Sequence, residues 1–109
     1  MGSFIYDAKV KVQIEDRALA HLQLVIFAKL RRGEPFVFTW DDDPGIGHGR
    51  TSVWLSPRSR MTFVFHGGRE PSVNRAWTEV LADSANSSTG LFLAHEPEQG
   101  SPAYGYSNR

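Results

Sequence analysis

The chain has 109 residues, 40% hydrophobic and 22% charged, which is the size and composition of one globular domain. It has no cysteine, which excludes disulfides, thiolate metal sites and cysteine nucleophiles and is consistent with a cytoplasmic location. No apolar run reaches the roughly 18 residues of a membrane span, and the N-terminus lacks a signal-peptide core, so we expect no membrane partner.

The net charge of zero conceals blocks of alternating sign. Residues 1–33 sum to +3, residues 34–49 to −4, residues 50–75 to +4 and residues 76–109 to −3. Two interpretations follow from this pattern. Either the blocks neutralise one another across the folded surface, or the arginine-rich block 50–75 forms a face that binds phosphate.

The N-terminal third predicts a strand followed by a helix. Residues 8–14 alternate between apolar and polar, which is typical of a half-buried strand. Phe4 and Tyr6 share this parity, so the strand would begin near residue 3 unless a turn forms at Asp7-Ala8. Apolar residues then recur at helical spacing from Asp16, a candidate N-cap, to Gly33, a candidate helix stop.

Three strands, a second helix and a final short strand are predicted next. The strands cover residues 36–40, 51–56 and 61–66. Ser72 would cap the second helix, which has the clearest amphipathic pattern in the chain, and residues 91–94 would form the last strand. Residues 98–109 are predicted to be a disordered C-terminal tail.

The predicted order is therefore β-α-β-β-β-α-β, in a single α+β domain over residues 1–97. Two helices cannot cover both faces of a sheet of about five strands. We expect a two-layer fold, with a mainly antiparallel sheet and both helices packed on one face. The other face would be partly exposed and available to a partner. A second copy of the chain, in a homodimer, is one such partner.

The loop DDDPGIGHGR at residues 41–50 raises the question of a metal or phosphate site. Its glycines lack the G-x-G-x-x-G spacing and lead into a strand, so no helix N-terminus is available for a phosphate. Its aspartates also lack the spacing of a calcium loop. A structured hairpin loop is the simpler interpretation, and Asp41, Asp43 and His48 are the alternative candidates for a divalent-cation site. We expect no cofactor.

Nucleic-acid binding is the function that the residues favour most. No G-x-S-x-G or H-E-x-x-H motif indicates hydrolytic or zinc chemistry. In the central third, arginines alternate with aromatic residues, a combination that can hold phosphates and stack bases. The candidate contact residues are Arg50, Arg58, Arg60, Arg69 and Trp54. We therefore predict a small non-catalytic binding domain, with DNA or RNA as the first partner to test.

Several stretches also resemble a family of short actinobacterial proteins of unknown function. They are MGSFIY at 1–6, EDRALAHLQ at 15–23, GRTSVW at 49–54 and NRAW at 74–77, and the resemblance spans residues 1–97. Members often carry the label "ATP-dependent DNA ligase", which implies nucleotidyl transfer to a lysine in a K-x-D-G context. Lys9, Lys11 and Lys29 all lack that context. A ligase-related protein and a structural homodimerisation domain remain the alternatives.

Overall fold

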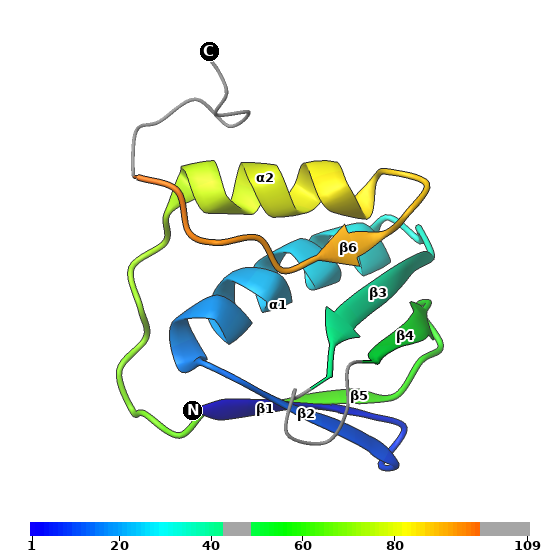
Figure 1. Cartoon of the computed structure of the whole chain (residues 1–109), viewed down its shortest axis with the longest axis horizontal. Coiled ribbons are helices and arrows are strands. Elements are labelled where there is room, and N and C mark those ends of the chain that lie inside the picture. Colours follow the sequence, from blue (N-terminus) through cyan, green and yellow to red (C-terminus); the bar gives the residue numbers. More distant parts are fainter. Residues whose placement is uncertain (43–48, 99–109) are drawn as a thin grey trace.

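The strands divide between two sheets, although the α+β class is as predicted (Figure 1). The computed structural model describes residues 1–42 and 49–98. Within these ranges the elements are β1 (Gly2–Tyr6), β2 (Val10–Ile14), α1 (Asp16–Arg31), β3 (Phe36–Asp41), β4 (Arg50–Leu55), β5 (Met61–Val64), α2 (Arg75–Ala85) and β6 (Leu91–Phe92). The expected single sheet of about five strands is replaced by two three-stranded sheets, sheet A with the order β2-β1-β5 and sheet B with the order β4-β3-β6.

A turn at Asp7 and Ala8 is the reason for the additional strand. Both residues have positive φ, 55° and 58°, and the Lys9 N–H donates to the Tyr6 carbonyl at 3.1 Å. Positive φ at both central residues is the geometry of hairpin turns that match the twist of the flanking strands. The turn alternative is therefore correct, and β1 pairs antiparallel with β2 on one side and with β5 on the other.

Sheet B is built around β3, which is antiparallel to β4 and parallel to β6. The side chains of β3 alternate, and Phe36, Phe38 and Trp40 enter the core. Thr39 lies on the opposite face, where its hydroxyl is 2.6 Å from that of Ser52 on β4. The sheet thus has one face in the core and one face that carries polar residues.

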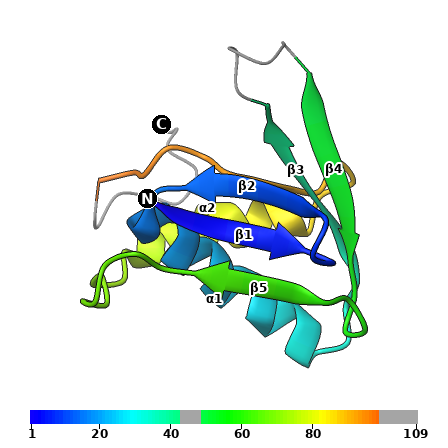
Figure 2. The same cartoon turned by 90° about the horizontal axis from the view of Figure 1, so that it is seen from below.

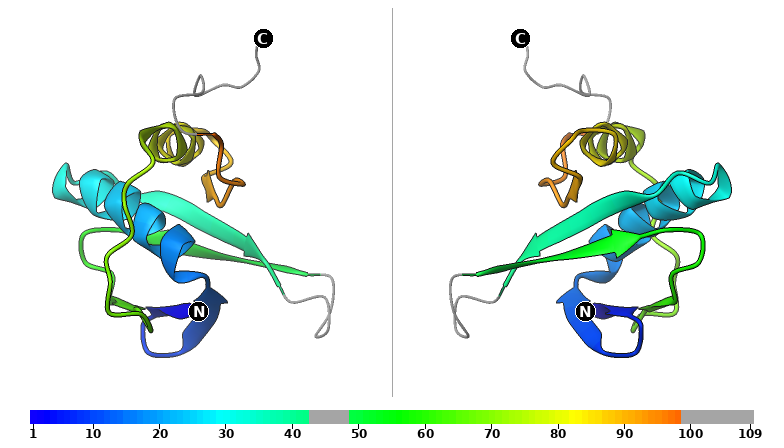
Figure 3. Two further views of the ribbon diagram at one scale, coloured as in Figure 1. Left: turned by 90° about the vertical axis from the view of Figure 1, so that its left-hand side faces the viewer. Right: turned by 90° about the vertical axis from the view of Figure 1, so that its right-hand side faces the viewer.

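The two helices stack in layers, so they do not share one face of a sheet as predicted (Figures 1 and 3). Helix α1 lies between sheet A and α2, and α2 also packs against β6. This position requires α1 to be apolar on more than one side. Its buried residues accordingly span a broad surface: Ala18, Leu19, His21, Leu22, Val25, Ile26 and Lys29.

Phe4 joins the two sheets at the centre of the core. Its ring is fully buried and makes edge contacts with Phe38 and Trp40 of sheet B at centroid distances of 5.4 and 6.1 Å. On its own sheet it contacts Phe63 at 5.2 Å. Such edge-to-face pairs are favoured by the aromatic quadrupole, and they hold the two sheets together.

Helix α2 starts after Asn74, so the predicted cap at Ser72 is wrong. The Asn74 side-chain oxygen accepts from the N–H groups of Ala76 at 3.1 Å and Trp77 at 3.4 Å. The carbonyl of Ser72 instead accepts a bond from Arg17 of α1 at 3.0 Å. Ser72 therefore lies in the segment before α2, where Arg17 ties it to α1.

The chain after β6 is bonded to α1 and to the start of α2 as far as Pro97. The indole N–H of Trp77 donates to the Ala94 carbonyl at 2.9 Å, and Arg17 forms an ion pair with Glu96 at 2.7 Å. The final strand is shorter than the predicted 91–94, because only residues 91 and 92 pair with β3. Of the predicted tail 98–109, residues 99–109 lie outside the described part of the chain.

Candidate nucleic-acid interface

Strand β4 presents an exposed tryptophan on the outer face of sheet B. Val53 and Leu55 point into the core, so Arg50, Ser52 and Trp54 lie on the other face. The Trp54 side chain is 57% exposed, whereas the other tryptophans, Trp40 and Trp77, are buried. An exposed indole on a strand can serve as a stacking surface for a base.

The connection from β4 to β5 places two arginines next to this tryptophan. The Ser59 N–H donates to the Ser56 carbonyl and the Ser56 N–H donates to the Ser59 hydroxyl, both at 2.9 Å. These reciprocal bonds fix a tight turn. Arg58 and Arg60 lie in or beside it, and both are exposed.

The β1–β2 turn adds a third cation that the sequence analysis did not include. The Asp7 N–H donates to the Arg60 carbonyl at 2.7 Å, and the Tyr6 hydroxyl donates to the Trp54 carbonyl at 2.9 Å. These two bonds bring Lys9, which is exposed in the same turn, to the side of Arg60. We call Lys9, Trp54, Arg58 and Arg60 the basic corner. Only the alternative turn at Asp7-Ala8 could have indicated that Lys9 belongs to it.

The other predicted arginines lie apart from the basic corner. Arg50 shares a face with Trp54 but is four residues away along β4, about 13 Å at the usual rise per residue. Arg69 follows β5, whereas Arg58 and Arg60 precede it, so these residues lie at opposite ends of that strand (Figure 2). The structure therefore brings together three of the five predicted contact residues, Trp54, Arg58 and Arg60.

The geometry of Lys29 gives no support to a nucleotidyl-transfer site. Lys29 is only 6% exposed, and its ammonium group donates to Asn86 at 2.5 Å and to Glu34 at 3.2 Å. A lysine in this setting holds the end of α1 against the end of α2. Lys9 and Lys11 lie on the exposed β1–β2 hairpin.

The metal hypothesis concerns a loop that is only partly described. Asp43 and His48 lie outside the described residues, and Asp41 stands opposite Arg50 in the β3–β4 register. Within residues 1–42 and 49–98, no three or more acidic, histidine or cysteine side chains gather in a way that could hold a metal ion. The end of the hairpin is closed by Asp42, whose N–H donates to the Gly49 carbonyl at 2.9 Å.

These features define a small α+β domain in which two three-stranded sheets and two helices share one aromatic core. The chain belongs to the family described as "Domain of unknown function (DUF7882)", which it matches over residues 1–96. Comparisons with curated proteins and with solved structures gave no match. Neither helix in the described ranges has the length and hydropathy required to cross a membrane.

Proposed function

We propose that this protein is a non-catalytic domain that binds single-stranded nucleic acid through the basic corner. The observation that carries this proposal is an exposed Trp54 whose carbonyl accepts from Tyr6 and Ser59, the residues that flank the turns with the exposed Lys9, Arg58 and Arg60. A base would stack on the indole, while Lys9, Arg58 and Arg60 would contact the phosphates on either side. The corner also contains Asp7, so its net charge is modest and we expect weak, salt-sensitive binding.

The geometry favours single strands over a duplex. A stacking residue can reach only a base that is unpaired and turned outward, and Trp54 belongs to a strand and not to a helix that could enter a major groove. The arginines suit phosphate because their planar fork can make two parallel bonds to it.

The test titrates the protein into a labelled oligonucleotide and measures binding by fluorescence polarisation at several salt concentrations. The oligonucleotide is used as single- and double-stranded DNA and as single- and double-stranded RNA. We expect the affinity to fall as the salt concentration rises. A plot of the logarithm of the binding constant against the logarithm of the salt concentration should have a slope on the order of −2 for three phosphate contacts. Arg58→Glu combined with Arg60→Glu should abolish binding. Trp54→Ala should weaken it by about 1–3 kcal/mol for each stacked base.

Arg69→Glu combined with Arg75→Glu is the matched control. It makes the same change in net charge at two exposed arginines, one in the loop beyond β5 and the other at the start of α2. This control should bind like the wild type. Equal losses in the two double variants would mean that only overall charge matters and would contradict the proposal, as would binding that does not respond to salt.

The alternative is a homodimer formed through the outer face of sheet B, because Trp54 is apolar as well as exposed. The oligomeric state should therefore be measured alongside the binding assay. Sedimentation or light scattering across a range of protein concentrations would detect it. A dimer that Trp54→Ala dissociates, together with no oligonucleotide binding, would replace the nucleic-acid proposal.

A further inference from the structure

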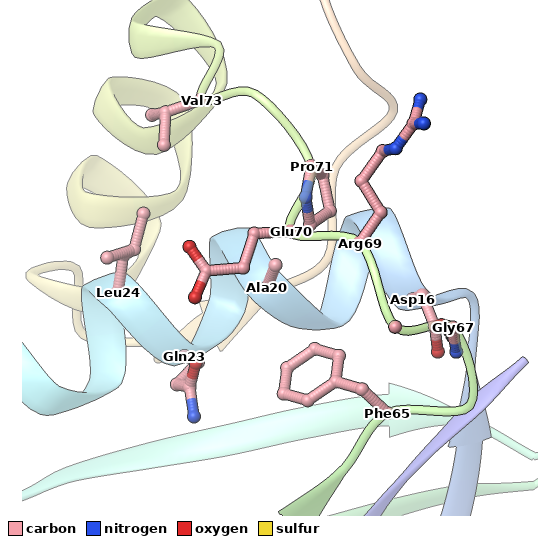
Figure 4. A pocket seen from close by; sticks show the side chains of 11 residues that line it. Asp16, Ala20, Gln23, Leu24, Phe65, Gly67, Arg69, Glu70, Pro71 and Val73 are labelled. Atoms are coloured by element: carbon pink, nitrogen blue, oxygen red, sulfur yellow. Dashed lines mark hydrogen bonds between the residues drawn. The ribbon is translucent and has the colours of Figure 1, made fainter.

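A pocket of about 350 Å³ lies beside the loop that follows β5, whereas the arginines of the basic corner precede that strand (Figure 4). One wall is the exposed side of α1, with Ala20, Gln23 and Leu24, and the other is the loop from residue 65 to residue 73. Its volume falls within the range of small-molecule sites, about 300–1,000 Å³. Nothing in the proposed nucleic-acid function uses this pocket.

Part of the pocket wall is apolar, although it faces solvent. Leu24 and Val73 are 46% and 47% exposed, which is high for large apolar side chains on two neighbouring elements. They line the pocket together with Pro71 and the ring of Phe65. An occupant with an alkyl portion would remove this surface from water.

The residues that line the pocket include two carboxylates and one guanidinium, so their net charge is negative. The Glu70 side chain points into the cavity from the loop, whereas the neighbouring Arg69 extends away from it (Figure 4). Asp16 adds a second carboxylate at the end next to Gly67. The N–H of Gly67 and that of His66 donate to this carboxylate and hold the pKa of Asp16 below its usual value, so the group stays ionised at neutral pH.

The same hydrogen bonds fix the shape of the pocket. The Asp16 oxygens accept from the Gly67 N–H at 2.7 Å and from the His66 N–H at 3.2 Å, which ties the start of the loop to the first turn of α1. A Cβ at residue 67 would lie 3.2 Å from an Asp16 oxygen, so glycine suits this close approach. The anchored loop thereby holds Phe65 and Glu70 opposite the outer face of α1.

We propose that this pocket binds a small organic cation, a primary amine or guanidinium carried on a short alkyl chain. A carboxylate and an aromatic ring both line the pocket, and together they can attract such cations through an ion pair and a cation–π contact. The charged group would lie between Glu70 and Phe65, and the alkyl chain would lie along Leu24 and Val73. A carboxylate or phosphate ligand would meet like charge in the same place.

The test uses n-pentylamine and its neutral analogue n-pentanol as probes of the full chain, with binding followed by calorimetry and by amide NMR shifts. The amine should bind and move the amide signals of Gln23, Gly67 and Glu70, and the alcohol should not. Glu70→Gln should weaken amine binding by about tenfold, because a charge-assisted bond is lost. Phe65→Leu keeps the apolar wall but removes the ring face, and it should weaken binding by about threefold.

Glu79→Gln is the matched control, because it neutralises an exposed carboxylate on α2 that does not line this pocket. It should leave the affinity unchanged, and the Glu70→Gln and Glu79→Gln variants should melt at the wild-type temperature. The proposal would be overturned if n-pentanol bound as well as the amine, if Glu70→Gln bound normally, or if no amide near the pocket responded.

Discussion

At the scale of single residues, four side chains hold the two helices and the C-terminal segment together. The ring of buried His21 bonds with the Arg17 carbonyl at 2.8 Å and accepts from the Asn74 N–H at 2.9 Å, which defines a neutral ring with its proton on Nδ1. The Asn74 amide donates to Glu96 at 2.9 Å. Arg17 meets the same carboxylate with two parallel bonds of 2.7 and 2.9 Å. The polar groups of the buried His21 and Asn74 are therefore satisfied within this network.

Glu96 makes this network sensitive to acid. The bidentate bond from Arg17, followed by that from Asn74, lowers the pKa of Glu96 from 4.5 to about 2. Because the folded-state pKa is the lower one, the carboxylate contributes stability that is complete above pH 4.5 and lost as the pH falls through 2. We expect Glu96→Gln to lower the urea midpoint at pH 7, and the difference from the wild type to shrink steadily below pH 4.5.

Asp83→Asn is the comparison for this measurement, because Asp83 is exposed on α2 and makes no ion pair with the described residues. Its urea midpoint should follow that of the wild type from pH 7 to pH 3. A Glu96→Gln variant that was as stable as the wild type at pH 7 would contradict the assignment.

At the scale of elements, the β1–β2 hairpin depends on a turn whose residues are not the most favourable for it. Asp tolerates positive φ better than most residues, but Ala8 at φ 58° has a Cβ that crowds the following carbonyl oxygen. The turn persists because its strands are held on both sides, by the pairing of β1 with β2 and by the bond from Asp7 to Arg60. The tertiary contacts thus override a local preference.

Ala8→Gly should therefore stabilise the protein. Removing the Cβ relieves the left-handed strain, which is worth about 1 kcal/mol, less the cost of a more flexible unfolded chain. Chemical denaturation should show the midpoint rising with an unchanged slope. Ala28→Gly is the opposite case, because Ala28 lies inside α1 and its replacement should cost about 1 kcal/mol. A destabilised Ala8→Gly variant would mean that the turn carries no strain.

At the scale of the whole molecule, the two sheets behave as one unit because their aromatic residues form one core. Phe4 of sheet A touches Phe38 and Trp40 of sheet B, and α1 closes the space between the sheets with Leu19, Leu22 and Ile26. Neither three-stranded sheet has a complete core of its own. Unfolding should therefore be a single cooperative transition.

Phe4→Ala tests this dependence of one sheet on the other. Losing a fully buried ring at the junction should cost about 3–5 kcal/mol, a large part of the stability of a domain of this size. Far-UV circular dichroism and tryptophan fluorescence should report the same lowered midpoint. Val64→Ala, at a 38% exposed position on β5, should change the stability by less than about 0.5 kcal/mol. Two separate transitions in the Phe4 variant would show that the sheets fold independently.

The basic corner shows which features of the candidate site can be predicted from the sequence and which cannot. The alternation of residues in β4 is enough to place Trp54 on the face opposite Val53 and Leu55, because successive side chains of a strand point to opposite faces. The block of five arginines could not reveal which of them are neighbours. The turn that carries Lys9 lies beside Arg60 because β1 pairs with β5, and Arg69 is separated from Arg60 by the length of that strand. The pocket beside Glu70 was not predicted, because its walls come from α1 and a loop more than forty residues away in the chain.

The sequence by itself determined the α+β class, both helices, the strands of the central third and the absence of any cysteine chemistry, because these depend on local periodicity and composition. Only the tertiary structure decided that the strands form two sheets, that α1 lies between sheet A and α2, and that Asn74 begins α2. These features depend on a strained turn, a shared aromatic core and bonds between residues distant in the chain. Such interactions compete in free energy with local preferences, and only the folded molecule shows which of them prevail.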